Sequence, residues 1–216
     1  MPSFLISHQA PAFLIKLKYP RKIDLVAICI GTIIPDLNLF FSILSRNFTH
    51  SFIGIIIVTV PITVFLTVIF IKYLTPLISW ISVQKCFILK PLRFFGLDNL
   101  KYLQPQLNKK FFLIASYSAF LGGLTHLLVD MPSHAYIDLF YPLFVIKVPF
   151  LIENINIYFG SIIIFNIHFT LEIMLHSLIR RIWDLFLIPI TLYLLRYIKK
   201  HNLIQIWNSS DEENYS

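Results

Sequence analysis

Two long apolar runs constrain this chain more than any other feature. Residues 51–74 contain a single charged side chain, Lys72, and residues 111–129 contain no Lys, Arg, Asp or Glu. A helix of about 20 apolar residues is long enough to cross the hydrocarbon core of a bilayer. The 216-residue chain as a whole is 57% hydrophobic and only 13% charged, unlike a soluble domain of this length. We therefore expect an integral membrane protein of the cell (plasma) membrane.

Further apolar segments bring the expected number of membrane helices to four or five. Residues 23–34 are too short to span unless the run continues to Leu44. Residues 158–178 and 183–198 are predicted to form two more helices, separated by Arg180 and Arg181. The expected fold class is all-α, an integral membrane helical bundle.

The segments between these helices have distinct compositions. Residues 75–110 carry several Lys and Arg and an amphipathic piece at 77–89, which is typical of a cytoplasmic loop. Residues 131–157 are rich in aromatic residues and Pro, which indicates irregular or interfacial structure. Without a linker or an internal repeat, we predict one membrane-embedded helical domain over 1–207, followed by a disordered polar tail over 208–216.

The charge and the cysteines exclude several classes of function. The formal charge is +7, but Lys and Arg flank apolar segments, where they anchor helices at the headgroups, so no nucleic-acid partner is expected. The basic start of the chain resembles a signal peptide but lacks a small-x-small cleavage site, and we expect it to be retained. Cys29 and Cys86 form neither a disulfide framework nor a zinc motif. Any metal must then be held by His and carboxylate.

The stretch from Gly122 to His134 is the best candidate for chemistry. His126 and Asp130 are four residues apart, so on a helix they share one face. Pro132 disfavours helix at the preceding residue, so His134 is expected on a loop that turns back over that face. Ionisable groups in such apolar surroundings are costly unless they have partners. A shared metal ion would compensate them.

Other His and carboxylate residues extend this set along the chain. The full set of candidate metal ligands is His8, Asp36, His50, His126, Asp130, His134, His168 and Glu172. Imidazole nitrogens with carboxylate oxygens suit Zn²⁺, with Mn²⁺ or Fe²⁺ as alternatives, and the set suffices for one to three ions. If 51–74 and 111–130 are antiparallel spans, Asp36, His50, His126 and Asp130 meet near one membrane face. His168 and Glu172 are predicted one helical turn apart.

Each of these residues also has an ordinary structural interpretation. His126 and Asp130 could be a hydrogen-bonded pair on a helix, and Asp36 could cap a helix after Pro35. Glu172 could pair with Arg180 or Lys147. His8 and His50 suit terminal and interfacial positions, and His176 and His201 are not assigned to the site. The cost of burying several carboxylates without a cation favours metal binding for the set as a whole.

The order and spelling of these motifs resemble a known family. Ser7-His8-x-Ala10, Gly31-x3-Pro35-Asp36, Thr49-His50-Ser51 and His126-x3-Asp130 look like the membrane-bound metal-dependent hydrolases and the domain-of-unknown-function 4184 family. The order is also distantly similar to that of the zinc-dependent phospholipase C and single-strand nuclease superfamily, whose members are all-helical and bind three zinc ions. The first resemblance covers residues 1–134 well and the remainder loosely.

The resemblance implies specific roles for these residues. Asp36, His50, His126 and Asp130 would hold one ion, Asp130 would bridge to a second ion that also uses His8, and His134, His168 and Glu172 would hold a third. The amino terminus is itself a ligand in the soluble relatives, a role open to Pro2 here only if Met1 is removed. The spacing from His134 to His168 exceeds that of the soluble enzymes.

These considerations predict a metal-dependent hydrolase. Zinc acidifies the water that it binds, and neighbouring ions suit a phosphoester. Asp36 is the candidate general base, and a site open to the bilayer suggests a lipid or lipid-linked substrate. A metal transporter or sensor and a structural membrane protein without metal are the alternatives. The loop 75–110 indicates that the ligands face outward, but the basic residues near His8 indicate the reverse.

Overall fold

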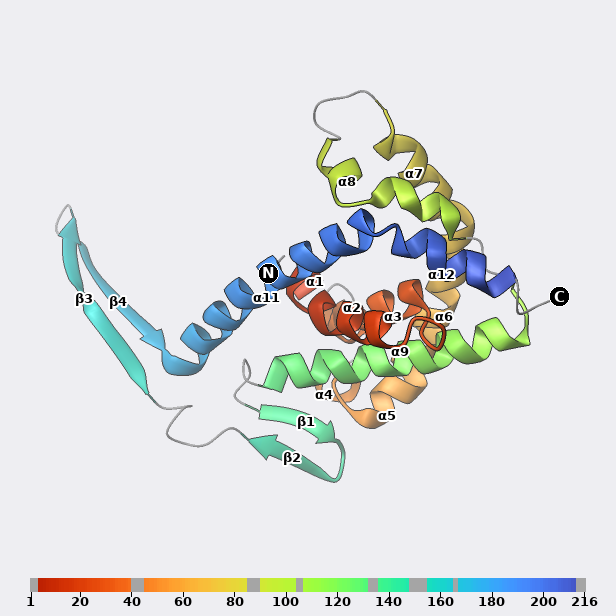
Figure 1. The fold of residues 1–216 in the computed structure, drawn as a ribbon. Coiled ribbons are helices and arrows are strands. Elements are labelled where there is room, and N and C mark those ends of the chain that lie inside the picture. Colours follow the sequence, from red (N-terminus) through yellow and green to blue (C-terminus); the bar gives the residue numbers. More distant parts are fainter. Residues whose placement is uncertain are drawn as a thin grey trace.

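The chain folds into a group of packed helices from which two β-hairpins extend (Figure 1). The computed structural model describes residues 4–39, 45–84, 90–103, 107–131, 136–147, 155–164 and 167–212. The first half contains α1 (Phe4–Ser7), α2 (Gln9–Lys18), α3 (Leu25–Gly31), the 3-10 helix η1 (Ile34–Leu39), α4 (Arg46–Thr49), α5 (Phe52–Gly54), the π-helical turn η2 (Ile55–Thr59), α6 (Val60–Ile69), a second π turn η3 (Phe70–Leu74) and α7 (Thr75–Ser82). The second half contains α8 (Lys90–Phe94), the 3-10 helix η5 (Leu97–Tyr102), α9 (Lys109–Asp130), β1 (Tyr136–Phe140), β2 (Phe144–Lys147), β3 (Asn156–Ile164), β4 (Ile167–Met174), α11 (Leu175–Lys200) and α12 (Leu203–Glu212).

The elements from α5 to α7 form one continuous helix, Phe52–Ser82. Its two π-helical turns end shortly before Pro61 and Pro76. A proline inside a helix removes one backbone donor and its ring crowds the carbonyl four residues earlier. The wider π turn accommodates both effects, so the helix continues through each proline.

The packing of α3 against α9 depends on two glycines. A Cβ on Gly31 would lie 2.6 Å from Ala119 O, and a Cβ on Gly122 would overlap Ile28 O. Only hydrogen at these positions allows the two backbones to touch, as in close helix pairs of membrane proteins. This contact brings the end of α3 beside the last turns of α9.

The long helix turns a threonine-rich face inward. Thr59, Thr63 and Thr67 recur every four residues, are fully buried, and lie where η2 and α6 pack on α9 and α3. Their hydroxyls have no hydrogen-bond partner among the described residues. Their compact, branched shape therefore serves close packing rather than a polar network.

Among the described residues, two helices are long and apolar enough to cross a membrane, Phe52–Ser82 and Lys109–Asp130. They correspond to the runs predicted at 51–74 and 111–129. The segment 23–34 contains only the seven-residue α3, followed by η1 after two further residues. Residues 183–198 are helical but lie within α11, where Arg180 and Arg181 continue the helix instead of separating two helices. That predicted break was wrong.

The helix expected over 158–178 was also wrong, and the fold is not purely helical. This segment forms most of the antiparallel hairpin β3–β4 and only then enters α11. The sequence here is dense in Ile, Phe and Tyr, and such residues favour strands over helices. A second antiparallel hairpin, β1–β2, occupies part of the region expected to be irregular. β3–β4 extends away from the helices, whereas β1 contacts α4 and α5 (Figure 1).

The C-terminal segment is more ordered than expected. α12 continues to Glu212, so residues 208–212 are helical rather than part of a disordered tail. Lys16 lies over the ring of Trp207 at 4.7 Å, which ties α12 to α2. The described part of the chain thus closes its C-terminal helix back onto the N-terminal one.

Candidate metal centre

The C-terminal end of α9 supplies two of the site residues. His126 is fully buried and Asp130 is 4% exposed. His126 Nε2 lies 3.5 Å from Asp130 Oδ2, because residues four apart on a helix project from the same face. The helical pair predicted from the sequence is therefore present.

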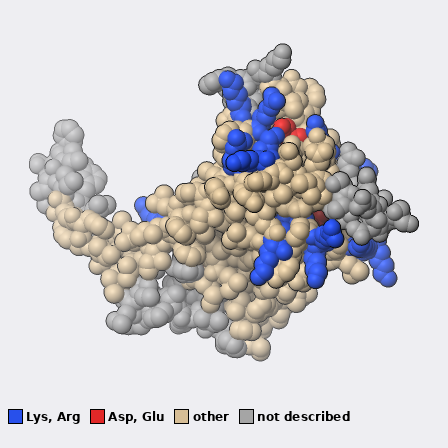
Figure 2. All heavy atoms as spheres, in the orientation of Figure 1, with Lys and Arg blue, Asp and Glu red and all other residues tan. Residues whose placement is uncertain are grey.

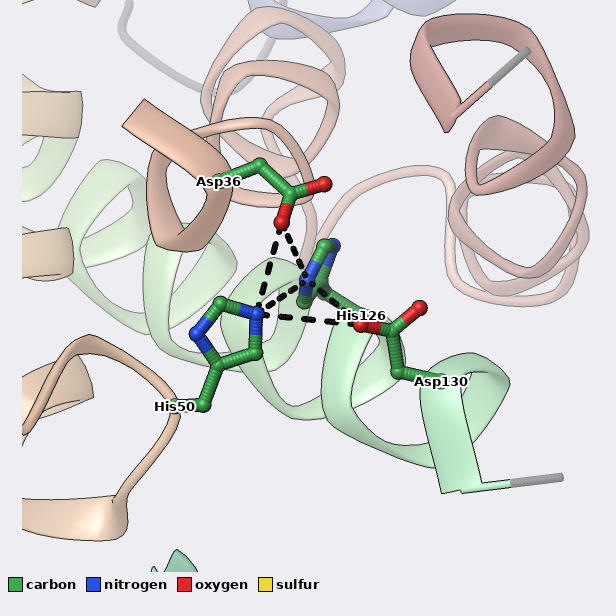
Figure 3. Close-up of side chains that lie close together, drawn as sticks. All are labelled: Asp36, His50, His126 and Asp130. Carbon is green, nitrogen blue, oxygen red and sulfur yellow. Dashed lines mark hydrogen bonds and ion pairs between the residues drawn. The ribbon is translucent and has the colours of Figure 1, made fainter. Parts of the chain in front are cut away.

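Two short elements supply the other half of the cluster. Asp36 lies in the first turn of η1, directly after Pro35. His50 lies between α4 and α5, where Ser51 accepts a hydrogen bond from the Gly54 N–H at 3.0 Å and starts the long helix. This cap turns the chain at His50 and directs its ring toward α9 (Figure 3).

Four side chains from these elements converge on one point (Figure 3). One ligand atom each from Asp36, His50, His126 and Asp130 lies within 4.8 Å of all the others. His50 Nε2 is 3.4 Å from Asp36 Oδ1, 3.4 Å from His126 Nε2 and 3.7 Å from Asp130 Oδ2. Ligands of a tetrahedral zinc ion, with bonds of about 2.0–2.1 Å, lie about 3.3 Å apart. A small contraction would bring this set to that spacing.

Backbone carbonyls fix the orientation of both imidazoles. His126 Nδ1 donates to Thr32 O at 2.8 Å, and His50 Nδ1 donates to Arg46 O at 3.2 Å. Because a carbonyl can only accept, each neutral ring carries its hydrogen on Nδ1 and presents a lone pair at Nε2. Two nitrogen lone pairs and two carboxylate oxygens then face one another. Such a group repels itself without a cation, and carbonyl-backed imidazoles are the usual arrangement of metal-binding histidines.

His8 extends the cluster on the side of Asp130. His8 Nε2 lies 2.9 Å from Asp130 Oδ1, and its ring stacks on His126 with centroids 4.6 Å apart. Asp130 therefore directs one carboxylate oxygen toward His8 and the other toward the four-residue cluster. His8 precedes α2 at the N-terminal edge of the molecule and is 4% exposed.

The electrostatic environment favours an ionised Asp36 carboxylate and a neutral His50 imidazole. Burial acts to raise the pKa of Asp36, but the hydrogen bond that a protonated His50 Nε2 would donate and the positive charge of a protonated His126 outweigh it, so the pKa lies below its usual value. A bound cation would supply the same positive charge to neutral rings. Burial lowers the pKa of His50, and the carboxylates offset this only in part. At neutral pH both groups are thus in the forms that bind cations.

The predicted helical pairing of His168 and Glu172 is wrong. His134 lies outside the described residues. His168 and Glu172 are on strand β4, where they pair with Ile163 and Tyr158. Four residues along a strand span about 13 Å, compared with about 6 Å along a helix, so the backbone positions of this pair are about twice as far apart as the prediction assumed.

The sequence gives little sign of the residues that support the cluster. Gln9 Nε2 donates to Thr32 Oγ1 at 2.6 Å and to Cys29 O at 3.2 Å, and it thereby holds the carbonyl that orients His126. A backbone carbonyl has no residue-type signature. The one sign of this support in the sequence was Gln9, a polar residue that directly follows His8 and begins an otherwise apolar stretch.

A family model matches residues 1–204, and its description is Domain of unknown function (DUF4184). The chain belongs to this family. Nearly the whole described structure, and all five clustered residues, lie inside the match to DUF4184. No curated protein and no solved structure matches the chain. What this DUF4184 protein does must therefore be argued from its own geometry.

Proposed function

We propose that this DUF4184 protein is a membrane-embedded, metal-dependent hydrolase of the plasma membrane that acts on a phosphoester. The observation that carries the proposal is the convergence of two carbonyl-backed imidazoles and two carboxylates on one buried point. Two buried carboxylates need compensating positive charge, which a bound cation supplies while the imidazoles stay neutral. The motif resemblance to membrane-bound metal-dependent hydrolases and, more distantly, to zinc-dependent phospholipases C and single-strand nucleases supports the same conclusion.

The donor set indicates which ion fits. Asp36, His50, His126 and Asp130 would hold zinc, because two nitrogens and two hard oxygens at near-tetrahedral spacing suit this ion, and Mn²⁺ or Fe²⁺ accept the same ligands. Zinc bound there supplies Lewis-acid activation of water and of a phosphoryl group at neutral pH. A second ion would use His8 and the Oδ1 atom of Asp130.

Asp36 has the properties of a general base. Its side chain is 14% exposed, compared with 5% for Asp130, 7% for His50 and 0% for His126. Oδ1 faces the cluster, so Oδ2 remains to accept the proton of the attacking water. Its lowered pKa keeps the carboxylate ionised at neutral pH. His126 and Asp130, which are more deeply buried, serve to hold the ion.

Apolar surface beside the cluster suggests a lipid or lipid-linked substrate. Leu128, between the two α9 ligands, is 64% exposed, and Ile53, three residues after His50, is 43% exposed. Met131 follows Asp130 and is also exposed. A substrate with acyl or isoprenoid chains would cover these side chains while its phosphoester reached the cluster.

The proposal is tested with protein purified in detergent, by elemental analysis and by hydrolysis of phospholipids with and without added zinc. We expect stoichiometric zinc and zinc-dependent turnover in the wild type. His126→Ala should lose the metal. Asp36→Asn should lose a larger fraction of its turnover than of its bound metal. His201→Ala is the matched control, because His201 packs on Tyr197 at the end of α11.

The possible outcomes separate the competing functions. Turnover that requires neither metal nor Asp36 would contradict the hydrolase proposal. Stoichiometric zinc without turnover, accompanied by metal uptake into vesicles, would indicate a transporter. Absence of metal from both the wild-type and the His126→Ala protein would indicate a structural role.

A further inference from the structure

The two candidate membrane helices have matching apolar lengths and matching ends. Residues 52–71 and 111–129 contain no Lys, Arg, Asp or Glu. Each stretch is about 30 Å long as a helix, the thickness of a bilayer core. Lys72 ends the first stretch, and Lys109 and Lys110 precede the second. The opposite ends of both stretches adjoin the metal cluster.

Packing shows that the two stretches run antiparallel and in register. Gly123, near the cluster end of α9, lies against Ile55 and Thr59 at the start of the long helix. At the other end, Ile71 belongs to the same core cluster as Phe111 and Ala115. Lys72 and Lys110 therefore lie at one end of the pair, and His50 and Asp130 at the other.

The N-terminal helix has the same polarity. His8, just before α2, contacts Asp130 at the cluster end. α2 then runs away from the cluster, so that Lys16 near its far end reaches Pro20 O and Ile23 O, both at 2.6 Å. The exposed residues Arg21 and Lys22 follow. The ten residues of α2 rise about 15 Å. The basic N-terminal residues thus lie toward the basic end and not beside His8, which weakens the conflict between their positive charge and an outward-facing cluster.

The last long helix also runs toward that end. Thr191 of α11 donates to Ile6 O at 2.9 Å, close to the cluster end of the bundle. Farther along α11, Arg196 lies over the ring of Phe94 at 4.2 Å, and Lys199 pairs with Asp98 at 2.6 Å. The C-terminal end of α11 therefore packs on the α8–η5 region.

The basic end collects most of the exposed positive charge. Figure 2 shows Lys and Arg gathered over α7, α8 and the ends of α9 and α11. The exposed basic residues of this end are Lys18, Arg21, Lys22, Lys72, Lys90, Arg93, Lys101, Lys109, Lys110, Arg196 and Lys200. Exposed Arg46 and Arg181 lie elsewhere. The positive-inside rule counts Lys and Arg and not net charge, so the acidic end of α12 does not change the orientation that it predicts.

Between the two ends the protein exposes a large apolar surface. Ile56, Ile57 and Phe65 on the long helix are 58%, 60% and 66% exposed, and Leu113 and Tyr117 on α9 are 64% and 54% exposed. A lipid bilayer is the partner that fits an apolar belt of this height with a basic rim at one end.

We propose that the basic end binds the anionic headgroups of the cytoplasmic leaflet and that the metal centre opens on the opposite, extracytoplasmic face. This inference goes beyond the proposed hydrolase activity and does not depend on it. A consequence, which rests on the proposed function, is that both the ion and the substrate reach the site from outside the cytoplasm.

Cysteine labelling in intact cells tests the orientation. In a Cys29→Ser, Cys86→Ser background, Leu143→Cys marks the cluster end, because β1, which leads into the turn that carries Leu143, contacts α4 and α5, and Leu143 is 81% exposed. Leu107→Cys marks the basic end, just before α9, and is 50% exposed. A membrane-impermeant maleimide should label only Leu143→Cys in intact cells and both variants after permeabilisation. Labelling of Leu107→Cys in intact cells would overturn the proposal.

A fusion reporter gives an independent readout that requires no metal. Because Trp207 of α12 packs on Lys16 near the basic end, a fluorescent protein fused after Ser216 should be fluorescent and a periplasmic phosphatase fused there inactive. An active phosphatase, or release of the chain from membranes by alkaline carbonate, would also overturn the proposal. Loss of zinc binding alone would refute the hydrolase and leave the orientation intact.

Discussion

Replacing Gly31 with alanine tests whether the spacing between α3 and α9 controls the metal centre. A Cβ at Gly31 would lie 2.6 Å from Ala119 O, whereas ordinary contact begins at 3.4 Å, so the two backbones must separate by about 0.8 Å. Overpacking of this kind costs about 1–3 kcal/mol. Thr32, the next residue, carries the carbonyl that accepts from His126 Nδ1 at 2.8 Å. A shift of that size would stretch this hydrogen bond beyond its effective range.

We therefore expect Gly31→Ala to weaken zinc binding by about 10–100-fold, the usual effect of losing support for a ligand, although no ligand is changed. The assays are zinc titration against a competing chelator and thermal unfolding in detergent. Gly123→Ala is the matched control on α9, because its Cβ would meet side-chain atoms, Ile55 Cγ2 at 2.9 Å and Ile55 Cγ1 at 3.1 Å, and not the backbone of a neighbouring helix. Unchanged zinc affinity in Gly31→Ala, or an equal loss in Gly123→Ala, would refute the reasoning.

Two further predictions concern residues away from the cluster. Thr63→Val should leave the unfolding temperature unchanged or raise it, because it removes a buried hydroxyl that has no described hydrogen-bond partner. Thr75→Val should lower the free energy of unfolding by about 1 kcal/mol, because the Thr75 hydroxyl donates a hydrogen bond to Ile71 O. Thermal unfolding distinguishes them, and a large loss in Thr63→Val would show that its hydroxyl is satisfied. His168→Ala with Glu172→Gln should retain the zinc content of the wild type by elemental analysis, since the two positions lie four residues apart on β4, about 13 Å along the strand. Loss of one equivalent of zinc would contradict this prediction.

The sequence by itself determined the features that depend on local patterns. The two long apolar runs correspond to Phe52–Ser82 and Lys109–Asp130, because length and hydropathy identify a helix of this kind without tertiary information. His126 and Asp130 were predicted to share a face because helical geometry fixes the contact between residues four apart.

Local patterns failed where two structures suit the same residues. The apolar segment 158–178 has no hydrophobic period that distinguishes a buried helix from strands. Its length favoured a helix, whereas its aromatic and β-branched residues favoured the strands β3 and β4 that the structure contains. The pairing of strands across the turn between β3 and β4 depends on contacts that no single stretch specifies.

Only the tertiary structure decided which distant groups meet. Asp36, His50 and His126 are far apart in the chain, and the glycine contact between α3 and α9 and the cap at Ser51 bring them together. The Thr32 carbonyl that orients His126 belongs to the backbone, so its role follows from position and not from residue type. A sequence specifies its helices through neighbours a few residues apart, whereas a metal centre requires several of those helices to be packed at fixed distances.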